Sequence, residues 1–468
     1  YKAGVRFFSE SIYYFWQIID TELMKTRLLE SIYYLQSQPP LFNIFLGIVY
    51  KIFPGHGAMT LCFHAIYTVM GLTMTLILCR TLRLARIPRV WALMLTVLFM
   101  ISPSCLAYEN FLMYTYPLAL FFTLAAYYLI RHAETGGFLT GLGFFACLTV
   151  IILIRGTYHL LYFIAVFWAV RLCLKPQWRR RFFWCAVGPF LLIAMVYVKN
   201  FALFGTLTSS GSWSGVVLAM GTTYQLPIET RQDLMDRKLL TPFAGINPLF
   251  SKPAQFRRYL PAQVKTGIPV LDQEYKSSGY PNMNNPLYLK ASEQCLRDGF
   301  FTLSHYPGVF WNTWRQSFIL YLIPGPSKFG GEGLSIENMQ RIGSFESVYN
   351  RWIIGEAYLP GFNLAGKNRK VGFNLPFVVG LPLILIVVPV LLYQQRRQRP
   401  QDFKPELVLT VFCWVSIGYT TIICTALGSL WNNRYRFNVE GLQLILTALV
   451  VHWIILTLLQ MDKKFQKS

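Results

Sequence analysis

The sequence predicts an all-α polytopic membrane protein, because of its composition, its apolar segments and the positions of its basic residues. Apolar residues make up 54% of the 468-residue chain, and charged residues make up only 14%. An uncharged apolar run of about 18 residues is long enough to cross a bilayer as a helix. We expect about nine such helices, over the ranges 57–79, 90–107, 112–130, 139–154, 157–171, 182–203, 374–393, 406–427 and 438–460.

Basic residues gather beside these apolar segments and give the chain a formal charge of +22. In a soluble protein this charge would indicate a nucleic-acid partner. Here the positive-inside rule accounts for it, so we predict membrane lipids and no nucleic acid as partners. The basic residues that we place in the cytoplasm are Arg80, Arg83, Arg86, Arg89, Arg171, Lys175, Arg179, Arg180, Arg181, Arg396, Arg397, Arg399, Lys404, Lys463, Lys464 and Lys467.

This orientation divides the chain into exterior and membrane-embedded parts. The segment 308–323 is short and contains two tryptophans and an arginine, which favours an amphipathic helix in the membrane interface over a crossing. Whether a further transmembrane helix precedes Tyr1 stays open. We predict an exterior first loop with juxtamembrane helices (1–56), a bundle of about six spans (57–203), an exterior region with an interfacial helix (204–373) and a C-terminal bundle of about three spans (374–468).

The first exterior loop contains a candidate catalytic residue, Asp20. A carboxylate near the membrane surface can accept a proton from an acceptor hydroxyl as that hydroxyl attacks an anomeric carbon. Asp20 can equally cap a helix that begins at Thr21, and Glu22 and Glu30 are rival carboxylates in the same loop.

A Pro-Pro step follows this loop, in the sequence Gln38-Pro39-Pro40-Leu41. Consecutive prolines disfavour helix before Leu41 and suit a helix that begins there. We predict a juxtamembrane helix over 41–53, which supports the floor of the site.

The exterior start of the last span contains Asn433, Arg434, Tyr435 and Arg436. Two guanidinium groups can bind a phosphate with planar, forked donors. Because this stretch is predicted to lie outside, the positive-inside rule does not explain its charge. The alternative is a structural ion pair with Glu440.

Three further polar residues lie at the outer ends of predicted spans. Arg155 and His159 sit between two short spans, where an arginine is costly unless it is paired, so it either binds a lipid phosphate or extends to the interface. Glu109 follows the span 90–107 and either binds sugar or acceptor, or is a solvated carboxylate.

The order of these motifs resembles the GT-C superfamily of integral membrane glycosyltransferases. The motifs are Asp20, Gln38-Pro39-Pro40-Leu41, Tyr108-Glu109-Asn110-Phe111-Leu112-Met113 and Asn433-Arg434-Tyr435-Arg436-Phe437. The chain is most similar to the branch that contains the dolichyl-phosphate-mannose protein mannosyltransferases and the lipid A aminoarabinose transferase. That branch carries an acidic residue in the first exterior loop, then a His/Lys-Pro-Pro-Leu step. Here the frequent Asp-Glu pair is Asp20-Thr21-Glu22 and the histidine is Gln38.

The resemblance implies a GT-C-like helix bundle that moves a sugar from a polyprenyl-phosphate donor to a lipid, glycan or protein acceptor. Transfer would occur on the non-cytoplasmic face of a multi-pass membrane protein, which we place in a bacterial inner membrane, where it would take part in glycosylation of the cell envelope. We expect no certain cofactor, and a divalent metal stays open. The predicted roles are Asp20 as general base, Arg434, Arg436 and Arg155 as phosphate ligands, and Glu109, Gln38, Tyr435, Asn433 and His159 as substrate contacts.

Two other classes of function compete with this hypothesis. A transporter or lipid flippase would need ionisable groups or broken helices near the middle of the membrane, whereas most charges here lie at span ends. A non-catalytic assembly subunit would tolerate replacement of Asp20.

Overall fold

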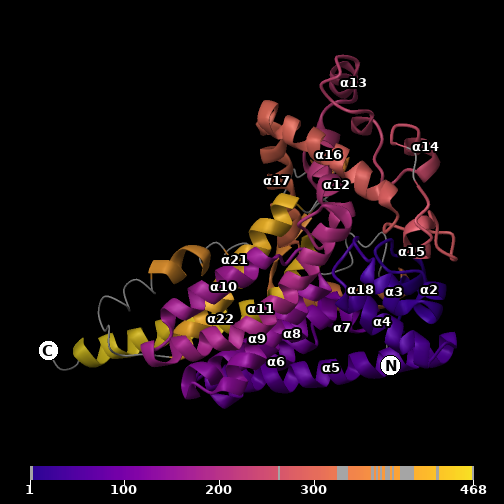
Figure 1. The fold of residues 1–468 in the computed structure, drawn as a ribbon. Helices are drawn as coiled ribbons and strands as arrows, with labels where there is room; N and C mark the ends of the chain where they lie inside the picture. Colours follow the sequence, from indigo (N-terminus) through magenta and orange to yellow (C-terminus); the bar gives the residue numbers. More distant parts are fainter. Residues whose placement is uncertain are drawn as a thin grey trace.

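The computed structural model describes residues 4–261, 264–323, 336–359, 363–364, 367–368, 371–374, 380–381, 384–390, 405–427 and 432–465. Their structure is helical, apart from two short antiparallel ribbons (Figure 1). Strand β1 (Glu356–Leu359) pairs with β4 (Val371–Asn374), and β2 (Asn363–Leu364) pairs with β3 (Lys367–Asn368). The predicted class, an all-α polytopic membrane protein, is confirmed.

Four of the described helices are long and apolar enough to cross a membrane. They are α5 (His56–Leu84), α11 (Pro176–Phe204), α21 (Pro405–Leu427) and the part Arg434–Leu459 of α22 (Asn432–Phe465). A fifth candidate is a broken pair, α6 (Arg89–Met100) and α7 (Pro103–Glu109), which bends by 59°.

The break between α6 and α7 has a local cause in the sequence. Ser102 caps α7 by accepting a hydrogen bond from the Cys105 N–H at 3.2 Å, and Pro103 occupies the first turn of the new helix. A proline cannot continue the hydrogen bonding of the preceding helix, so the helix direction changes here.

Helices also occupy the shorter apolar segments of the first bundle. These are α8 (Thr115–Thr135), α9 (Phe138–Ile154) and α10 (Leu160–Cys173), and α9 and α10 are shorter than the 18 residues expected of a full span. Half of the predicted span 374–393 lies outside the described residues, and its described parts 380–381 and 384–390 are helical. Helix α8 packs against α5, α9, α21 and α22, so it joins the N-terminal and C-terminal parts of the bundle.

Four short helices precede the first long span: α1 (Ser11–Tyr14), α2 (Thr21–Thr26), α3 (Leu28–Tyr33) and α4 (Leu41–Ile52). Helix α4 begins directly after the Pro-Pro step, as predicted from the fixed φ of proline. In Figure 1, α2, α3 and α4 lie at the end of the bundle where α5 begins.

A helical and irregular region follows α11. It contains α12 (Gly211–Gly221), η1 (Thr223–Gln225), α13 (Ile228–Asp236), η2 (Pro242–Ala244), α14 (Pro253–Arg257), α15 (Pro269–Asp272), α16 (Pro286–His305), α17 (Pro307–Leu322), α18 (Ile336–Val348) and the π-helix η4 (Tyr349–Ile354). Its core is the packing of α12 on α16, where a Cβ at Gly215 would lie 1.7 Å from the Ser292 carbonyl oxygen. Only glycine allows the two backbones to approach this closely.

Helix α17 coincides with the segment for which the sequence predicted an interfacial helix. It contacts α21 and α22, and the Trp314 indole N–H donates to the Thr425 hydroxyl at 2.9 Å. Its location in the membrane interface, and the four-part division of the chain, stay predictions.

Candidate functional site

Asp20 is 5% exposed and stands at the N-cap of α2. Its carboxylate accepts a hydrogen bond from the Glu22 N–H at 3.3 Å, so the capping role that the sequence left open is present. Capping uses one bond of a group that can accept several, so it does not exclude a second role.

The segment before Asp20 is held by Asn43, a buried residue of the first turn of α4. The Asn43 amide oxygen accepts from the Ile19 N–H at 2.9 Å, and its amide nitrogen donates to the Gln17 carbonyl at 3.3 Å. The Pro-Pro step starts α4, and α4 in turn fixes the backbone that presents Asp20.

A turn between α15 and α16 covers the Asp20 carboxylate. We call residues Tyr275–Pro281, whose ends form a β-bridge, the capping turn. Within it the Ser277 N–H donates to Oδ2 of Asp20 at 2.8 Å, and the Ser277 hydroxyl donates to Oδ1 at 2.5 Å. Gly279 has φ +82°, which lets the turn close tightly.

Lys276 of the capping turn lies beside Asp20 and is 4% exposed. Its ammonium donates to the Phe15 carbonyl oxygen. Burial lowers the pKa of Lys276 to about 7, and the negative charge of Asp20 acts against this shift. Burial thus favours the neutral amine of Lys276 in this closed arrangement.

Two arginines and two tyrosines form a second group, in which Arg155 and Tyr114 are buried and Arg434 and Tyr435 are half-buried. We call it the arginine–tyrosine cluster. The Cζ atom of Arg155 lies 4.7 Å from the ring centroid of Tyr114 and 4.0 Å from that of Tyr435. Arg434 faces the same two rings, at 6.0 Å and 5.5 Å. Aromatic rings offset part of the cost of burying a guanidinium group but leave its N–H edges available.

The guanidinium of Arg155 retains an unused donor. Arg155 is 6% exposed, and its Nε–H donates to the Thr157 hydroxyl at 3.1 Å. Its buried Nη1 has no hydrogen-bond partner among the described residues. An unpartnered buried donor on a cation is costly, so this position suits an anionic ligand.

Gln17 joins the cluster to the loop of Asp20. The Gln17 amide donates to the Tyr114 hydroxyl at 3.5 Å. Asp20 is three residues further along, so the two Cα atoms are at most about 11 Å apart. Tyr114 thus links the loop of the candidate base to the two arginines.

The Pro-Pro step also contacts the loop of Arg155. A Cβ at Gly156 would lie 1.9 Å from the Ser210 hydroxyl oxygen and 3.7 Å from Cδ of Pro39. Gln38 is buried, and its side-chain nitrogen has no hydrogen-bond partner among the described residues. Gln38, which the sequence predicted as a substrate contact, therefore has an unused donor beside Pro39.

Arg436 forms the structural ion pair with Glu440 that the sequence offered as the alternative to phosphate binding. It is 2% exposed, and its Nε–H donates to Glu440 at 2.9 Å. Its Nη1 donates to the carbonyl oxygens of Tyr321 and Ile323 at 2.7 Å and 3.0 Å. These bonds join α22 to the end of α17 and occupy the guanidinium of Arg436, and its predicted role as a phosphate ligand, like those of Arg155 and Arg434, stays a prediction.

The other residues predicted to contact substrate are Glu109, His159 and Asn433. Glu109 lies against α5, where a Cβ at Gly71 would come within 2.9 Å of its Oε1. His159 precedes α10, and its backbone N–H donates to the Tyr419 hydroxyl at 3.3 Å. The side chain of Asn433 lies outside what the structure describes.

Sequence reasoning missed Ser277, Gln17, Asn43 and Tyr114 as parts of this site. For metal ligands, no three His, Cys, Asp or Glu side chains gather in the part of the chain that the structure describes.

No protein-family model and no curated protein matches this sequence. Two solved structures are similar to it. One is the archaeal oligosaccharyltransferase AglB from Archaeoglobus fulgidus in complex with an inhibitory peptide and a dolichol-phosphate, with a TM-score of 0.40 and 12% identity over 99% of this chain and 49% of that chain. The other is an A. fulgidus oligosaccharyltransferase tethered to an acceptor peptide with the NVT sequon, with a TM-score of 0.41 and 15% identity over 97% of this chain and 47% of that chain.

This chain therefore spans about half the length of either structure. At these TM-scores, the similarity carries no argument about the site. The resemblance of the sequence motifs to the GT-C superfamily, and to one branch within it, stays a prediction.

Proposed function

We propose that this protein is a glycosyltransferase that moves a sugar from a polyprenyl-phosphate donor to an acceptor on the non-cytoplasmic face of the membrane. The observation that carries the proposal is the buried guanidinium of Arg155, with its unused Nη1, beside Arg434 in the arginine–tyrosine cluster. A lipid-linked phosphate would supply the missing anion and keep its prenyl chain in the apolar surroundings of the bundle.

In the proposed reaction, the cluster binds the phosphate that leaves. As the bond between the anomeric carbon and the phosphate oxygen breaks, the electron pair stays on that oxygen and negative charge grows there. Arg155 is already buried and Arg434 half-buried, and both are held against aromatic rings, so they would stabilise the transition state more than the bound donor. The Gln38 amide is placed to add a neutral donor.

Asp20 would act on the acceptor. The acceptor hydroxyl forms the new bond to the anomeric carbon and gives its proton to the Asp20 carboxylate. In the structure this carboxylate binds the Ser277 hydroxyl, which therefore occupies the position that the acceptor hydroxyl would take. The capping turn must release Asp20 before an acceptor can bind.

Binding of a polyprenyl phosphate tests the proposal without knowledge of the acceptor. We expect the purified protein to bind a fluorescent polyprenyl phosphate, and Arg155→Gln to weaken that binding by at least about tenfold, the size of a lost bond to a charged group. Fluorescence anisotropy in detergent measures the Kd. Arg297→Gln is the matched control, because Arg297 is an exposed arginine of α16.

Equal binding by wild type, Arg155→Gln and Arg297→Gln would show that the cluster does not hold the lipid phosphate. Binding of the same strength to a neutral polyprenol would also exclude the phosphate as the recognised group.

The capping turn gives a separate prediction about the acceptor. Ser277→Ala removes the hydroxyl that competes for Asp20, so the KM for acceptor should fall about tenfold while kcat changes little. Transfer at varied acceptor concentration measures both constants. Ser278→Ala is the control, because its hydroxyl donates to the Tyr13 carbonyl and not to Asp20. A large loss of kcat in Ser277→Ala would instead make Ser277 part of the catalytic machinery.

A further inference from the structure

Two separate connections hold helices α3 and α4 close to the ends of long apolar helices that are candidate membrane spans. Only Phe53, Pro54 and Gly55 separate α4 from the long helix α5, so the facing ends of the two helices are within about 14 Å of each other. Near the end of α11, another long span, the Lys199 ammonium donates to the carbonyl oxygens of Tyr33 and Leu35 at 2.9 Å and 2.8 Å. In Figure 1 both short helices lie at that end of the bundle.

These two helices carry exposed apolar side chains that no described part of the protein covers. Leu29 is 85% exposed, and Ile48 and Ile52 are one helical turn apart on the same face of α4. Exposed large apolar groups at a membrane boundary favour contact with acyl chains. We call this set the apolar face; its members are Leu29, Tyr33, Ile48, Ile52 and Phe53.

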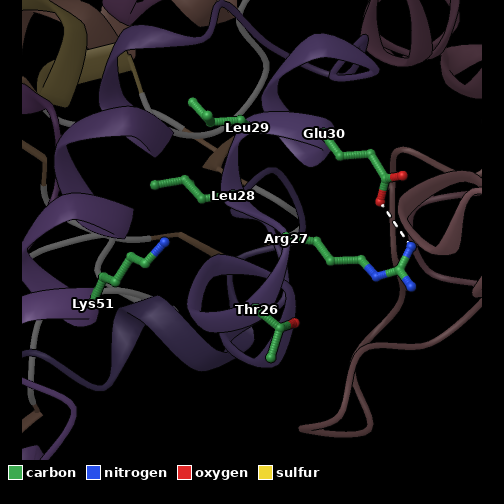
Figure 2. Close-up of a pocket in the computed structure, with 6 residues that line it drawn as sticks. All are labelled: Thr26, Arg27, Leu28, Leu29, Glu30 and Lys51. Atoms are coloured by element: carbon green, nitrogen blue, oxygen red, sulfur yellow. Dashed lines mark hydrogen bonds and ion pairs between the residues drawn. The ribbon is translucent and has the colours of Figure 1, made fainter.

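A pocket of about 280 Å³ opens between the α2–α3 turn and α4, beside the apolar face. Figure 2 shows its lining side chains, Thr26, Arg27, Leu28, Leu29, Glu30 and Lys51. The pocket therefore combines polar and apolar walls.

The charges of this pocket do not cancel. Arg27 pairs with Glu30 at 3.2 Å, and in Figure 2 it points away from Lys51 toward that partner. The amine of Lys51 points toward the α2–α3 turn, and no carboxylate pairs with it among the described residues. One positive charge thus stays available beside an apolar surface at the membrane boundary.

We infer that this pocket binds the phosphate of an anionic glycerophospholipid, whose acyl chains lie along the apolar face. Lys51 would contact the phosphate. The Thr26 hydroxyl donates to the Glu22 carbonyl oxygen at 2.7 Å, so its oxygen would accept a hydrogen bond from the glycerol part. The inference depends on the membrane location of α5 and α11 and not on the proposed transfer of sugar. A bound lipid there would hold α4, and through Asn43 the Asp20 loop, at a fixed height above the bilayer.

Lipid retention by the full-length protein tests this site. The protein is reconstituted into vesicles of equal parts phosphatidylcholine and phosphatidylglycerol, extracted in mild detergent and analysed by native mass spectrometry. We expect wild type to retain phosphatidylglycerol and Lys51→Gln to retain about fivefold less, the effect of one basic residue at an anionic surface. Lys51→Arg keeps the charge and should behave as wild type.

Lys238→Gln is the matched control, because Lys238 is an exposed lysine just beyond α13, far from the bundle in Figure 1. Equal retention by Lys51→Gln and Lys238→Gln would overturn the inference. If soluble glycerol 1-phosphate displaces phosphatidylglycerol at comparable concentration, the acyl chains do not contribute and the occupant is a free phosphate ester. Either result leaves the polyprenyl-phosphate measurement unaffected.

Discussion

Replacement of Asp20 by asparagine should abolish sugar transfer while the protein still folds and inserts. Asparagine caps a helix about as well as aspartate, so the bond from the Glu22 N–H to this position can persist. The amide oxygen can also accept from Ser277. What an amide cannot do is accept the acceptor's proton, and a positioned general base contributes about 10²- to 10⁴-fold to a rate.

The measurement is release of labelled sugar from a polyprenyl-phosphate donor, with cell membranes as the source of acceptor. Glu22→Gln is the control, because Glu22 is an exposed carboxylate in the same helix. The melting temperature of Asp20→Asn should stay close to that of wild type. Near-normal turnover by Asp20→Asn would remove this residue from the mechanism, and comparable losses in both variants would indicate a general effect of charge in the loop.

Much of the fold was predictable because it depends on local rules. The start of α4 follows from Pro39-Pro40, and the start of α16 follows from Asn285 and Pro286, whose cap the structure contains. The number of full spans was less predictable. The sequence shows that 90–107 is apolar, but the break at Ser102 and Pro103 bends it into two helices.

The site was predictable only where its parts are close in the sequence. Asp20 could be chosen because it precedes a helix and a Pro-Pro step. Its contact with Ser277 spans 257 positions and depends on how an irregular region folds back, for which no periodic pattern exists. Asn43 was passed over because it looks like one polar residue in an apolar helix.

The different contacts of Arg434 and Arg436 could have been expected from their spacing along the helix. Arg434 and Arg436 are two positions apart on one helix, so they point in different directions. Glu440 is four positions after Arg436, a spacing that favours an ion pair and could have separated the two roles. Arg434 instead faces Tyr114 and Tyr435 in the cluster.

Because Arg434 faces Tyr114 and Tyr435 whereas Arg436 pairs with Glu440, we expect a large and specific effect of Arg434→Ala on the use of donor. Loss of its charge should lower kcat/KM for the lipid-linked donor by about a hundredfold, because a preorganised group that stabilises developing charge contributes about that much. The KM for acceptor should stay close to that of wild type, since Asp20 and the capping turn are untouched. Steady-state transfer with each substrate varied in turn measures the two effects.

Arg436→Ala is the informative comparison for Arg434→Ala. It leaves the buried Glu440 carboxylate and two carbonyl groups of the α17 end unpaired, and breaking such a buried pair costs about 3–5 kcal/mol of stability. Its melting temperature should therefore fall, whereas that of Arg434→Ala should change little. Equal losses for donor and acceptor in Arg434→Ala would count against the phosphate role, because a group that meets only the leaving phosphate must act on the donor side of the reaction.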